Sequence, residues 1–400
     1  MKTAVFSRLI AVITVSLIAT TSSYAQSTWS GGATPFSGFS AAGNWDVAPT
    51  SGGANNLFFA GSVNLSPSND ITLTTLDTGI TFNPGASTFT IIGGAIRAGN
   101  ITNNSSVVQN IIQSLRLNGT RTINVGSAGM FLGQPVGSTS TSSRTVTKTG
   151  SGDLTITGGN AASGGSSYNV LQGALVFSNS VGQVTSLGAG AAPFPSVSLA
   201  ASGTSLRLNN AGTVTIAGGV TTVSGSSVIL GLSSGTLILS NTLNIASGAT
   251  LSGIGTIKSG NVLVSGDVEP GTLGIIGGLT NKNTLTFTPG SSITMELDRS
   301  LAINADLLAG GTLNFDGLLN ITNIGTSLQL GDIFNLFDGT LSGTFASTNL
   351  PTLGAGLGWD FSLFSSQGII SVEAVPEPTT VALFSTAAVA VIWRARRRRS

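Results

Sequence analysis

The stretch Lys148–Asn179, KTGSGDLTITGGNAASGGSSYNVLQGALVFSN, decides the fold of this 400-residue chain. It contains two short runs, Leu154 to Ile156 and Val170 to Phe177, in which apolar and polar residues alternate between turns of Gly, Ser and Asn. Such alternation predicts strands that bury one face only. A single strand–turn–strand unit cannot cover that face by itself, so it requires similar units stacked on both sides.

The remainder of the chain supplies such units. From Ser62 to about Thr344, apolar pairs recur at i and i+2, as in Ile123 with Val125 and Leu313 with Phe315, and side chains so spaced point to the same face of a strand. The 55 glycines are roughly twice the usual share and the 8% of charged residues roughly a third of it. We therefore predict an all-β solenoid, with repeats of about 20–29 residues and on the order of 12–17 rungs.

The composition excludes several classes of function. The chain has no Cys and no His, which rules out disulfides, thiolate or imidazole metal sites, and Ser-His-Asp or Cys-His catalysis. Between Gln26 and Ala374 there are nine Lys/Arg and fourteen Asp/Glu, so this part carries a net charge of 9 − 14 = −5. A nucleic-acid partner would need a basic stripe, and the sequence has none. We expect no cofactor.

Two carboxylate pairs are the candidates for a metal or glycosidase-type site, namely Asp267, Glu269, Glu296 and Asp298. Each pair is spaced i, i+2 and so shares one face of a strand, where it could bind calcium or flank a glycosidic bond. Because Val268 and Leu297 point to the opposite face, we expect all four carboxylates to face solvent, with Arg299 forming a surface ion pair beside Asp298. On this interpretation they form neither a metal site nor a catalytic site, and the protein is not an enzyme.

The N-terminal segment 1–25 has the features of a secretory signal peptide. Lys2 and Arg8 precede an apolar run from Leu9 to Ala19, and a small residue pattern follows that predicts cleavage after Ala25. The run is too short to be preferred as a membrane span. We therefore expect export through a secretion translocon.

Residues 26–61 are predicted to form an N-terminal cap. They gather six aromatic residues among Gly, Pro and Asn, namely Trp29, Phe36, Phe39, Trp45, Phe58 and Phe59. Aromatic residues in such a place either plug the open end of a solenoid core or form a platform for sugars. The sequence leaves both alternatives open, with plugging the more usual.

The C-terminal segment 375–400 contains three successive signals. It begins with Val375, Pro376, Glu377 and Pro378, continues with an apolar run from Thr379 to Trp393, and ends with Arg394, Arg396, Arg397, Arg398 and Arg399. The apolar run predicts a membrane helix, and the arginines predict that its C-terminal end stays in the cytoplasm while the body lies outside.

Three parts of the chain resemble known families. Lys148 to Asn160 with Gly173 to Phe177 resembles the autotransporter-associated beta strand repeat, which implies a right-handed parallel β-helix over 62–345 on a bacterial surface; 346–374 resembles the closing segment of autotransporter passenger domains. Segment 375–400 resembles the PEP-CTERM sorting domain. That resemblance implies recognition of Pro376–Pro378 by an exosortase, a membrane cysteine transpeptidase, and removal of the helix and arginine tail.

Together these features predict an exported, non-enzymatic protein that passes transiently through the inner membrane. Its expected location is the cell surface or extracellular matrix, with a structural or adhesive role and exopolysaccharide or other glycans as partners. Two alternatives stay open: a carbohydrate-active β-helix enzyme and an ice-binding solenoid. The second is suggested by Thr-x-Thr pairs at Thr72/Thr74, Thr155/Thr157, Thr213/Thr215 and Thr286/Thr288.

Overall fold

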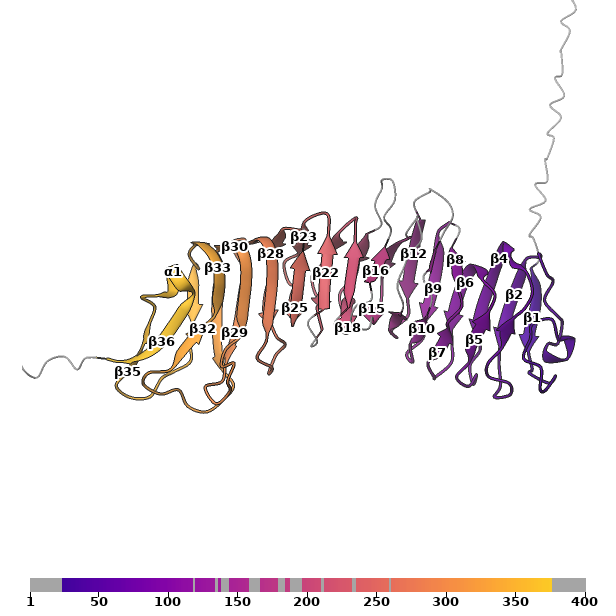
Figure 1. The fold of residues 1–400 in the computed structure, drawn as a ribbon, viewed down its shortest axis with the longest axis horizontal. Coiled ribbons are helices and arrows are strands. Elements are labelled where there is room, and N and C mark those ends of the chain that lie inside the picture. Colours follow the sequence, from indigo (N-terminus) through magenta and orange to yellow (C-terminus); the bar gives the residue numbers. More distant parts are fainter. Residues whose placement is uncertain are drawn as a thin grey trace, which may run out of the picture.

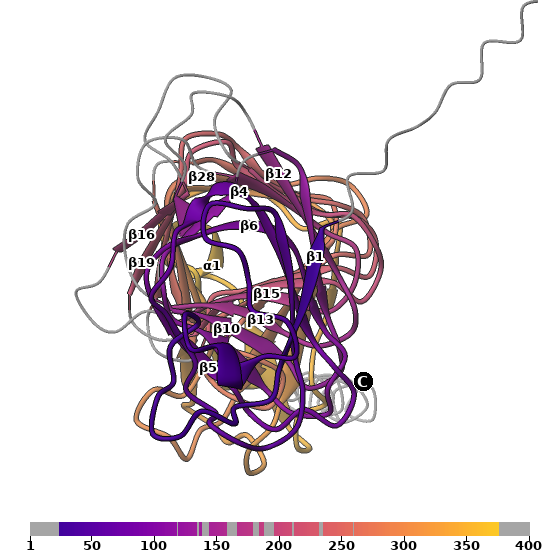
Figure 2. The same cartoon turned by 90° about the vertical axis from the view of Figure 1, so that its right-hand side faces the viewer.

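The alternating runs form strands that stack in parallel from one turn of the chain to the next. The computed structural model describes residues 24–375 except 118, 134–135, 138–143, 158–165, 179–183, 188–195, 210–211, 232–234 and 259. This part coils into an elongated rod with the two ends of the chain at opposite ends of it (Figure 1). Viewed along the rod, the turns superpose around a common core (Figure 2). The described residues thus form long parallel sheets arranged on three faces, which fits a β-helix.

The first face begins at the N-terminal end of the rod. Its strands are β1 (Ala25–Trp29), β2 (Asn55–Phe59), β9 (Arg121–Val125), β12 (Arg144–Thr149), β14 (Ser166–Val170), β17 (Val197–Leu199), β20 (Val220–Thr221), β23 (Leu243–Ile245) and β26 (Val262–Val264). Five longer strands bend from the third face into the first, namely β4 (Leu73–Phe82), β6 (Ile96–Asn103), β28 (Gly278–Phe287), β30 (Leu307–Phe315) and β33 (Phe337–Gly343). They join both faces into one 20-stranded sheet.

The second face is a separate sheet of 13 parallel strands. These are β3 (Ser68–Asn69), β5 (Thr90–Gly93), β7 (Gln109–Ile111), β10 (Met130–Leu132), β13 (Leu154–Ile156), β15 (Ala174–Ser178), β18 (Ser205–Asn209), β21 (Ser227–Ile229), β24 (Thr250–Gly253), β27 (Asp267–Pro270), β29 (Ser292–Leu297), β31 (Leu318–Asn323) and β34 (Ser347–Asn349). The third face adds β8 (Leu115–Leu117), β11 (Val136–Gly137), β16 (Val184–Leu187), β19 (Thr213–Ile216), β22 (Gly235–Leu239) and β25 (Gly255–Lys258).

The length of a rung varies along the rod. On the second face Leu251 pairs with Val268, 17 residues later, whereas Leu175 pairs with Leu206, 31 residues later. These second-face strands keep their register while the corner loops absorb the difference. The all-β fold with long parallel sheets fits the predicted β-helix; its right-handed sense stays a prediction, which the general preference for right-handed parallel crossovers supports.

One inner column of the first face contains a charged residue. In-register pairing places Lys148 between Ile123 of the preceding strand and Val170 of the following one. Ile123 and Val170 are fully buried, and so is Lys148. A lysine therefore occupies a position that aliphatic side chains fill in the neighbouring rungs.

Three backbone carbonyls accept hydrogen bonds from the buried ammonium group. Lys148 Nζ donates to the oxygens of Thr149 at 3.2 Å, Gly150 at 2.6 Å and Gln172 at 2.8 Å. Burial lowers the pKa of Lys148 to about 8, while the Asp153 carboxylate acts in the opposite direction. The three acceptors use all three ammonium donors and tie the turns of two successive rungs together.

Aromatic side chains close the N-terminal end of the core. Trp29 and Trp45 meet edge to face with ring centroids 4.9 Å apart, and Phe39 meets Trp45 in the same way at 5.2 Å. These rings and Phe59 are buried, next to the short 3-10 helix η1 (Ala42–Asn44). Of the two interpretations of the N-terminal aromatics, plugging the core is correct for these four residues.

A different arrangement covers the C-terminal end. Strands β32 (Ile333–Asn335), β36 (Ile369–Ala374) and β35 (Leu357–Asp360) form a small antiparallel sheet, and the single turn α1 (Phe364–Gln367) lies against β33. Phe315 contacts both Phe337 and Phe345 with ring centroids 4.7 Å apart, and Phe364 packs on Phe337. Both ends of the core are therefore covered by rings.

The terminal signals lie largely outside the described residues. The predicted signal peptide up to residue 23 and the sorting segment from Pro376 onward are not described, whereas Ala25 begins β1 and Val375 follows β36. In the described part, no helix is long and apolar enough to cross a membrane. The predicted membrane segment, Thr379 to Trp393, belongs to the part that is not described.

The three hydrogen bonds of Lys148 Nζ, which we call the Lys148 clamp, give a testable prediction about stability. Replacing Lys148 by Met keeps the side-chain length but removes three hydrogen bonds of a charged donor, so the free energy of unfolding should fall by about 2–4 kcal/mol. Urea unfolding followed by circular dichroism measures this change. Lys258→Met, at an exposed lysine on the third face, is the matched control. Equal effects of the two substitutions would contradict a structural role for the clamp.

Candidate functional site

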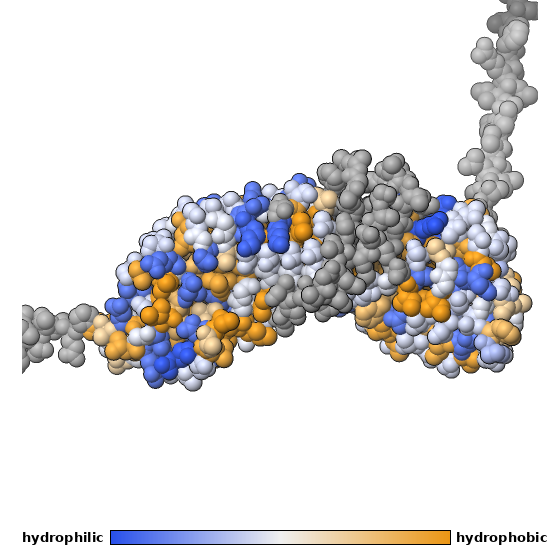
Figure 3. Space-filling view, viewed as in Figure 1, coloured by the Kyte–Doolittle hydropathy of each residue, from blue (hydrophilic) through white to orange (hydrophobic). Residues whose placement is uncertain are grey.

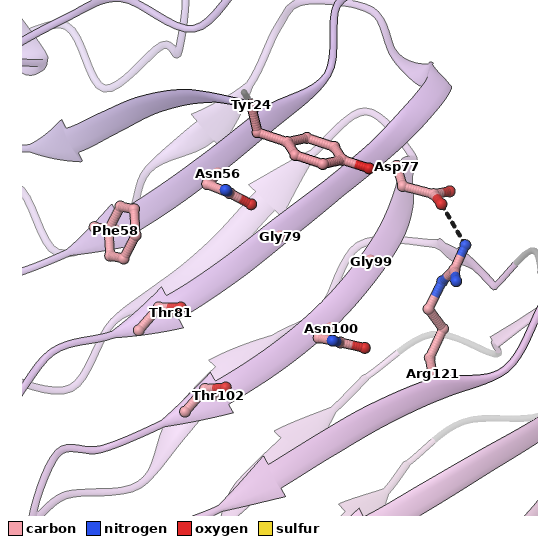
Figure 4. Close-up of a pocket in the computed structure, with 10 residues that line it drawn as sticks. All are labelled: Tyr24, Asn56, Phe58, Asp77, Gly79, Thr81, Gly99, Asn100, Thr102 and Arg121. Atoms are coloured by element: carbon pink, nitrogen blue, oxygen red, sulfur yellow. Dashed lines mark hydrogen bonds and ion pairs between the residues drawn. The ribbon is translucent and has the colours of Figure 1, made fainter. Parts of the chain in front are cut away.

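A groove of about 360 Å³ lies on the outer side of the first face near the N-terminal end of the rod. It is lined by ten residues from the start of β1 to β9, namely Tyr24, Asn56, Phe58, Asp77, Gly79, Thr81, Gly99, Asn100, Thr102 and Arg121. Phe58, Thr81 and Thr102 lie in register on three successive strands and form one wall (Figure 4). Outward-facing positions of the sheet therefore build this site.

Irregular pairing between β4 and β6 shapes the floor of the groove. Thr78 pairs with Ala98 and Ile80 with Ile101, so Gly99 and Asn100 together stand opposite Gly79 alone. Such a bulge changes the direction of a side chain without disturbing the strands beyond it. A Cβ atom at Gly79 would lie 2.3 Å from Asn56 Oδ1, so a larger residue at position 79 would displace the Asn56 side chain. The bulge and the small residue at position 79 therefore both shape the floor of the groove.

An ion-pair network forms the second wall. Asp77 protrudes from an irregular part of β4 and accepts hydrogen bonds from Arg97 Nε at 2.7 Å and from Arg121. Arg121 Nε also donates to the Ala98 carbonyl at 3.2 Å. Figure 4 shows the Tyr24 side chain reaching toward Asp77 across the opening. With two guanidinium groups around one carboxylate, this wall carries a formal charge of +1.

The groove combines the groups that recognise a sugar ring. Phe58 offers an aromatic face to the C–H side of a sugar, while Asn56, Asn100 and the threonines offer amide and hydroxyl groups to its oxygens. Tyr24 precedes the predicted cleavage after Ala25, so the processed chain would have Phe58 as the aromatic side chain of the groove. The mature groove would therefore be more open on that side.

The four sequence-predicted carboxylates do not form one site. Asp267 accepts a hydrogen bond from Ser292 Oγ at 2.5 Å, and the half-buried Asp298 accepts one from Ser300 Oγ at 2.6 Å. Burial, followed by the charges of Asp267 and Glu296, raises the pKa of Glu269. Among the residues that the structure describes, no three acidic side chains converge in a way that could hold a metal ion.

Two expectations about these carboxylates are wrong. Glu296 is not solvent-facing but buried, because the loop after β27 folds over it and Gly274 N donates to both carboxylate oxygens at 2.7 and 2.9 Å. Arg299 does not pair with Asp298. It reaches Asp332 on the next rung at 2.9 Å instead.

Asp306 is a buried carboxylate that the sequence analysis missed. It accepts hydrogen bonds from the backbone N–H groups of Gly277 and Glu296, both at 2.8 Å. Burial raises the pKa of Asp306 to about 7; these two donors oppose the rise, and the Glu296 and Glu269 charges add to it. Asp306 lies ten residues from Glu296 in the chain, and no motif indicated that the two meet. The arrangement holds two corner loops together.

Threonines form one outward column on the third face. Thr213, Thr236, Thr256 and Thr280 pair in register. The column beside it contains Thr215, Ile238 and Lys258 rather than a second row of threonines. A flat Thr-x-Thr array, as an ice-binding surface requires, is therefore not formed on these strands.

Comparison with known proteins gives one match. The PEP-CTERM protein-sorting motif matches residues 374–398. No curated protein and no solved structure matches the chain.

The buried Asp306 predicts a pH dependence of stability. Its pKa is raised in the folded state, so the folded chain retains a proton that the unfolded chain has released between about pH 4 and 7. The contribution of Asp306 to stability is therefore present at acidic pH and is lost as the pH rises through 7.

Urea unfolding at pH 4.5 and 7.5 tests this expectation. Relative to Asp306→Asn, the original chain should lose about 2–4 kcal/mol more of its free energy of unfolding on going to pH 7.5. Asp338→Asn, at an exposed aspartate of β33, is the control and should follow the original chain. The same pH dependence in all three proteins would rule out Asp306 as the group responsible.

Proposed function

We propose that this protein is a non-enzymatic structural or adhesive component of a cell surface or extracellular matrix. The proposal starts from the PEP-CTERM motif, which supports an exported protein that is processed by an exosortase. The chain would leave through a secretion translocon, remain in the inner membrane through Thr379 to Trp393, and be processed at Pro376–Pro378. The resemblance of Lys148–Phe177 to autotransporter-associated repeats is compatible with this role. It too remains a prediction.

The groove on the first face is the observation that carries the adhesive role. It offers an aromatic ring, amides, hydroxyls and a cationic wall in one concave surface, which suits a neutral or carboxylate-bearing polysaccharide. Binding is favoured over cleavage because the acidic side chain of the groove, Asp77, is held in two ion pairs. A hydrolase would require two carboxylates flanking the bond.

The polysaccharide proposal predicts a loss of affinity on removing Phe58. An aromatic contact is worth about 1 kcal/mol, so Phe58→Ala should weaken binding about fivefold. Asn100→Ala, which removes an amide but no core contact, should weaken binding in the same direction. Isothermal titration with polysaccharide from the producing culture and with neutral glucan measures both changes.

Phe131→Ala is the matched control, because Phe131 is an outward-facing phenylalanine on the second face. It should bind as the original chain does. Unchanged binding in Phe58→Ala and Asn100→Ala, with measurable binding in the original chain, would exclude the groove as the site.

The sorting proposal predicts that processing depends on the Pro-Glu-Pro stretch. Replacing Pro376, Glu377 and Pro378 by alanine should leave the arginine tail attached and the protein in the membrane fraction. Intact-mass spectrometry of the exported protein measures its C-terminus. Alanine substitution of Thr379 and Thr380, just beyond the stretch, is the control. Normal processing of the triple variant would show that recognition lies elsewhere.

A further inference from the structure

Six exposed aliphatic side chains gather near the C-terminal end of the rod. They lie on the segments that join the second face to the third in three consecutive rungs, with Ile333 at the start of β32, and we call them the aliphatic face: Leu273, Ile275, Leu301, Ile303, Leu330 and Ile333. Leu273 is 79% exposed, Ile303 74% and Leu330 62%. Figure 3 shows apolar residues at the surface over this part of the rod. The core contains none of the six.

Hydrogen bonds hold the three loops side by side. Gly274, next to Leu273, donates to buried Glu296, and Asp306 joins the first loop to the second through Gly277. Asn304, next to Ile303, donates its side-chain amide to the Ile333 carbonyl at 2.9 Å, which joins the second loop to the third. The aliphatic side chains are thus presented on a fixed surface.

The charged groups within the face neutralise each other. Arg299 pairs with Asp332 across the second and third loops at 2.9 Å. Asp298 lies half-buried at the border. The middle of the face is therefore apolar and uncharged, which suits a lipid surface without a requirement for anionic headgroups.

The chain leaves the rod beside this face. Gly331, next to Leu330, donates its N–H to the Val372 carbonyl at 2.9 Å, and Val375, three residues further, is half exposed. Only three residues separate Val375 from the apolar run that begins at Thr379. At about 3.5 Å per extended residue, those four steps span at most about 14 Å. When the run is in the bilayer, this end of the rod must lie close to the membrane surface.

We propose that the aliphatic face inserts into the interfacial region of the lipid bilayer while the C-terminal segment is still attached. The inference rests on the proposed membrane stage of sorting. The tail and the face then form two points of attachment, which fix the tilt of the rod and hold Pro376–Pro378 at the bilayer surface, within reach of a membrane enzyme.

Single-cysteine labelling tests this contact, since the chain has no native cysteine. Ile303→Cys or Leu330→Cys in the full chain is labelled with the fluorophore NBD and reconstituted into phosphatidylcholine vesicles, with or without acyl chains brominated near the headgroup. At both positions the brominated lipid should quench emission at least twofold. Val63→Cys, an exposed aliphatic position at the opposite end of the rod, should show no quenching.

A label at Ser385→Cys reports insertion of the tail independently. Quenching at Ser385 without quenching at Ile303 would overturn the lipid contact and leave the membrane stage of sorting intact. No quenching at either position would overturn both. A blue-shifted but unquenched label at Ile303 would indicate a second protein copy and would also overturn the proposal.

A second variant distinguishes contact of the aliphatic face with lipid from mere proximity to lipid that the inserted tail imposes. In an Ile303→Ser/Leu330→Ser background the tail is unchanged, but the face loses two of its most exposed apolar side chains. A label at Ile333→Cys should then lose at least half of its bromolipid quenching, while a label at Ser385→Cys keeps its own. Full quenching at Ile333 in this background would show that the tether alone brings that label to the lipid, against the proposal.

Discussion

In-register stacking of side chains is the constraint on which this structure depends. Each rung exposes an apolar edge that only another rung or a terminal cap can cover, so every inward position is chosen against its neighbours one strand above and below. The column from Ile123 through Lys148 to Val170 shows how strict the requirement is. A lysine is accepted there because its alkyl chain fills the aliphatic position and its ammonium group finds three carbonyls at the corner.

The sequence predicts the parts of the fold that follow from the alternation of inward and outward side chains along a strand. Runs such as Leu154 to Ile156 and Leu313 to Phe315 are strands, and the inward members of each are buried. The same alternation distinguishes Phe59, in the core, from Phe58, on the groove. This alternation does not indicate how long the corner loops are. With rungs of 17 to 31 residues, the sequence does not show which outward side chains become neighbours.

The wrong expectations for Glu296 and Arg299 arose because the sequence does not show the course of the corner loops. Glu296 points outward from its strand as the pattern requires, but the loop from the preceding rung covers it, and that loop has no periodic signal. Asp306 and the partner of Arg299 also come from corners. The groove itself depends on a bulge opposite Gly79, where one extra residue in β6 alters the surface without altering the inward pattern. Irregular backbone, which sequence period cannot locate, therefore builds the candidate site.

The number of stacked rungs also sets the length of the molecule. Thirteen second-face strands about 4.8 Å apart correspond to a body of roughly 60 Å. Strands β2, β4 and β6, which line the groove, lie near one end of the rod, and β36 lies at the other (Figure 1). In the proposed membrane-attached state, such a rod would act as a stalk with a fixed reach. A ligand in the distal groove would be kept several nanometres from the point of attachment, and each rung added or deleted between them would change that reach by one strand spacing.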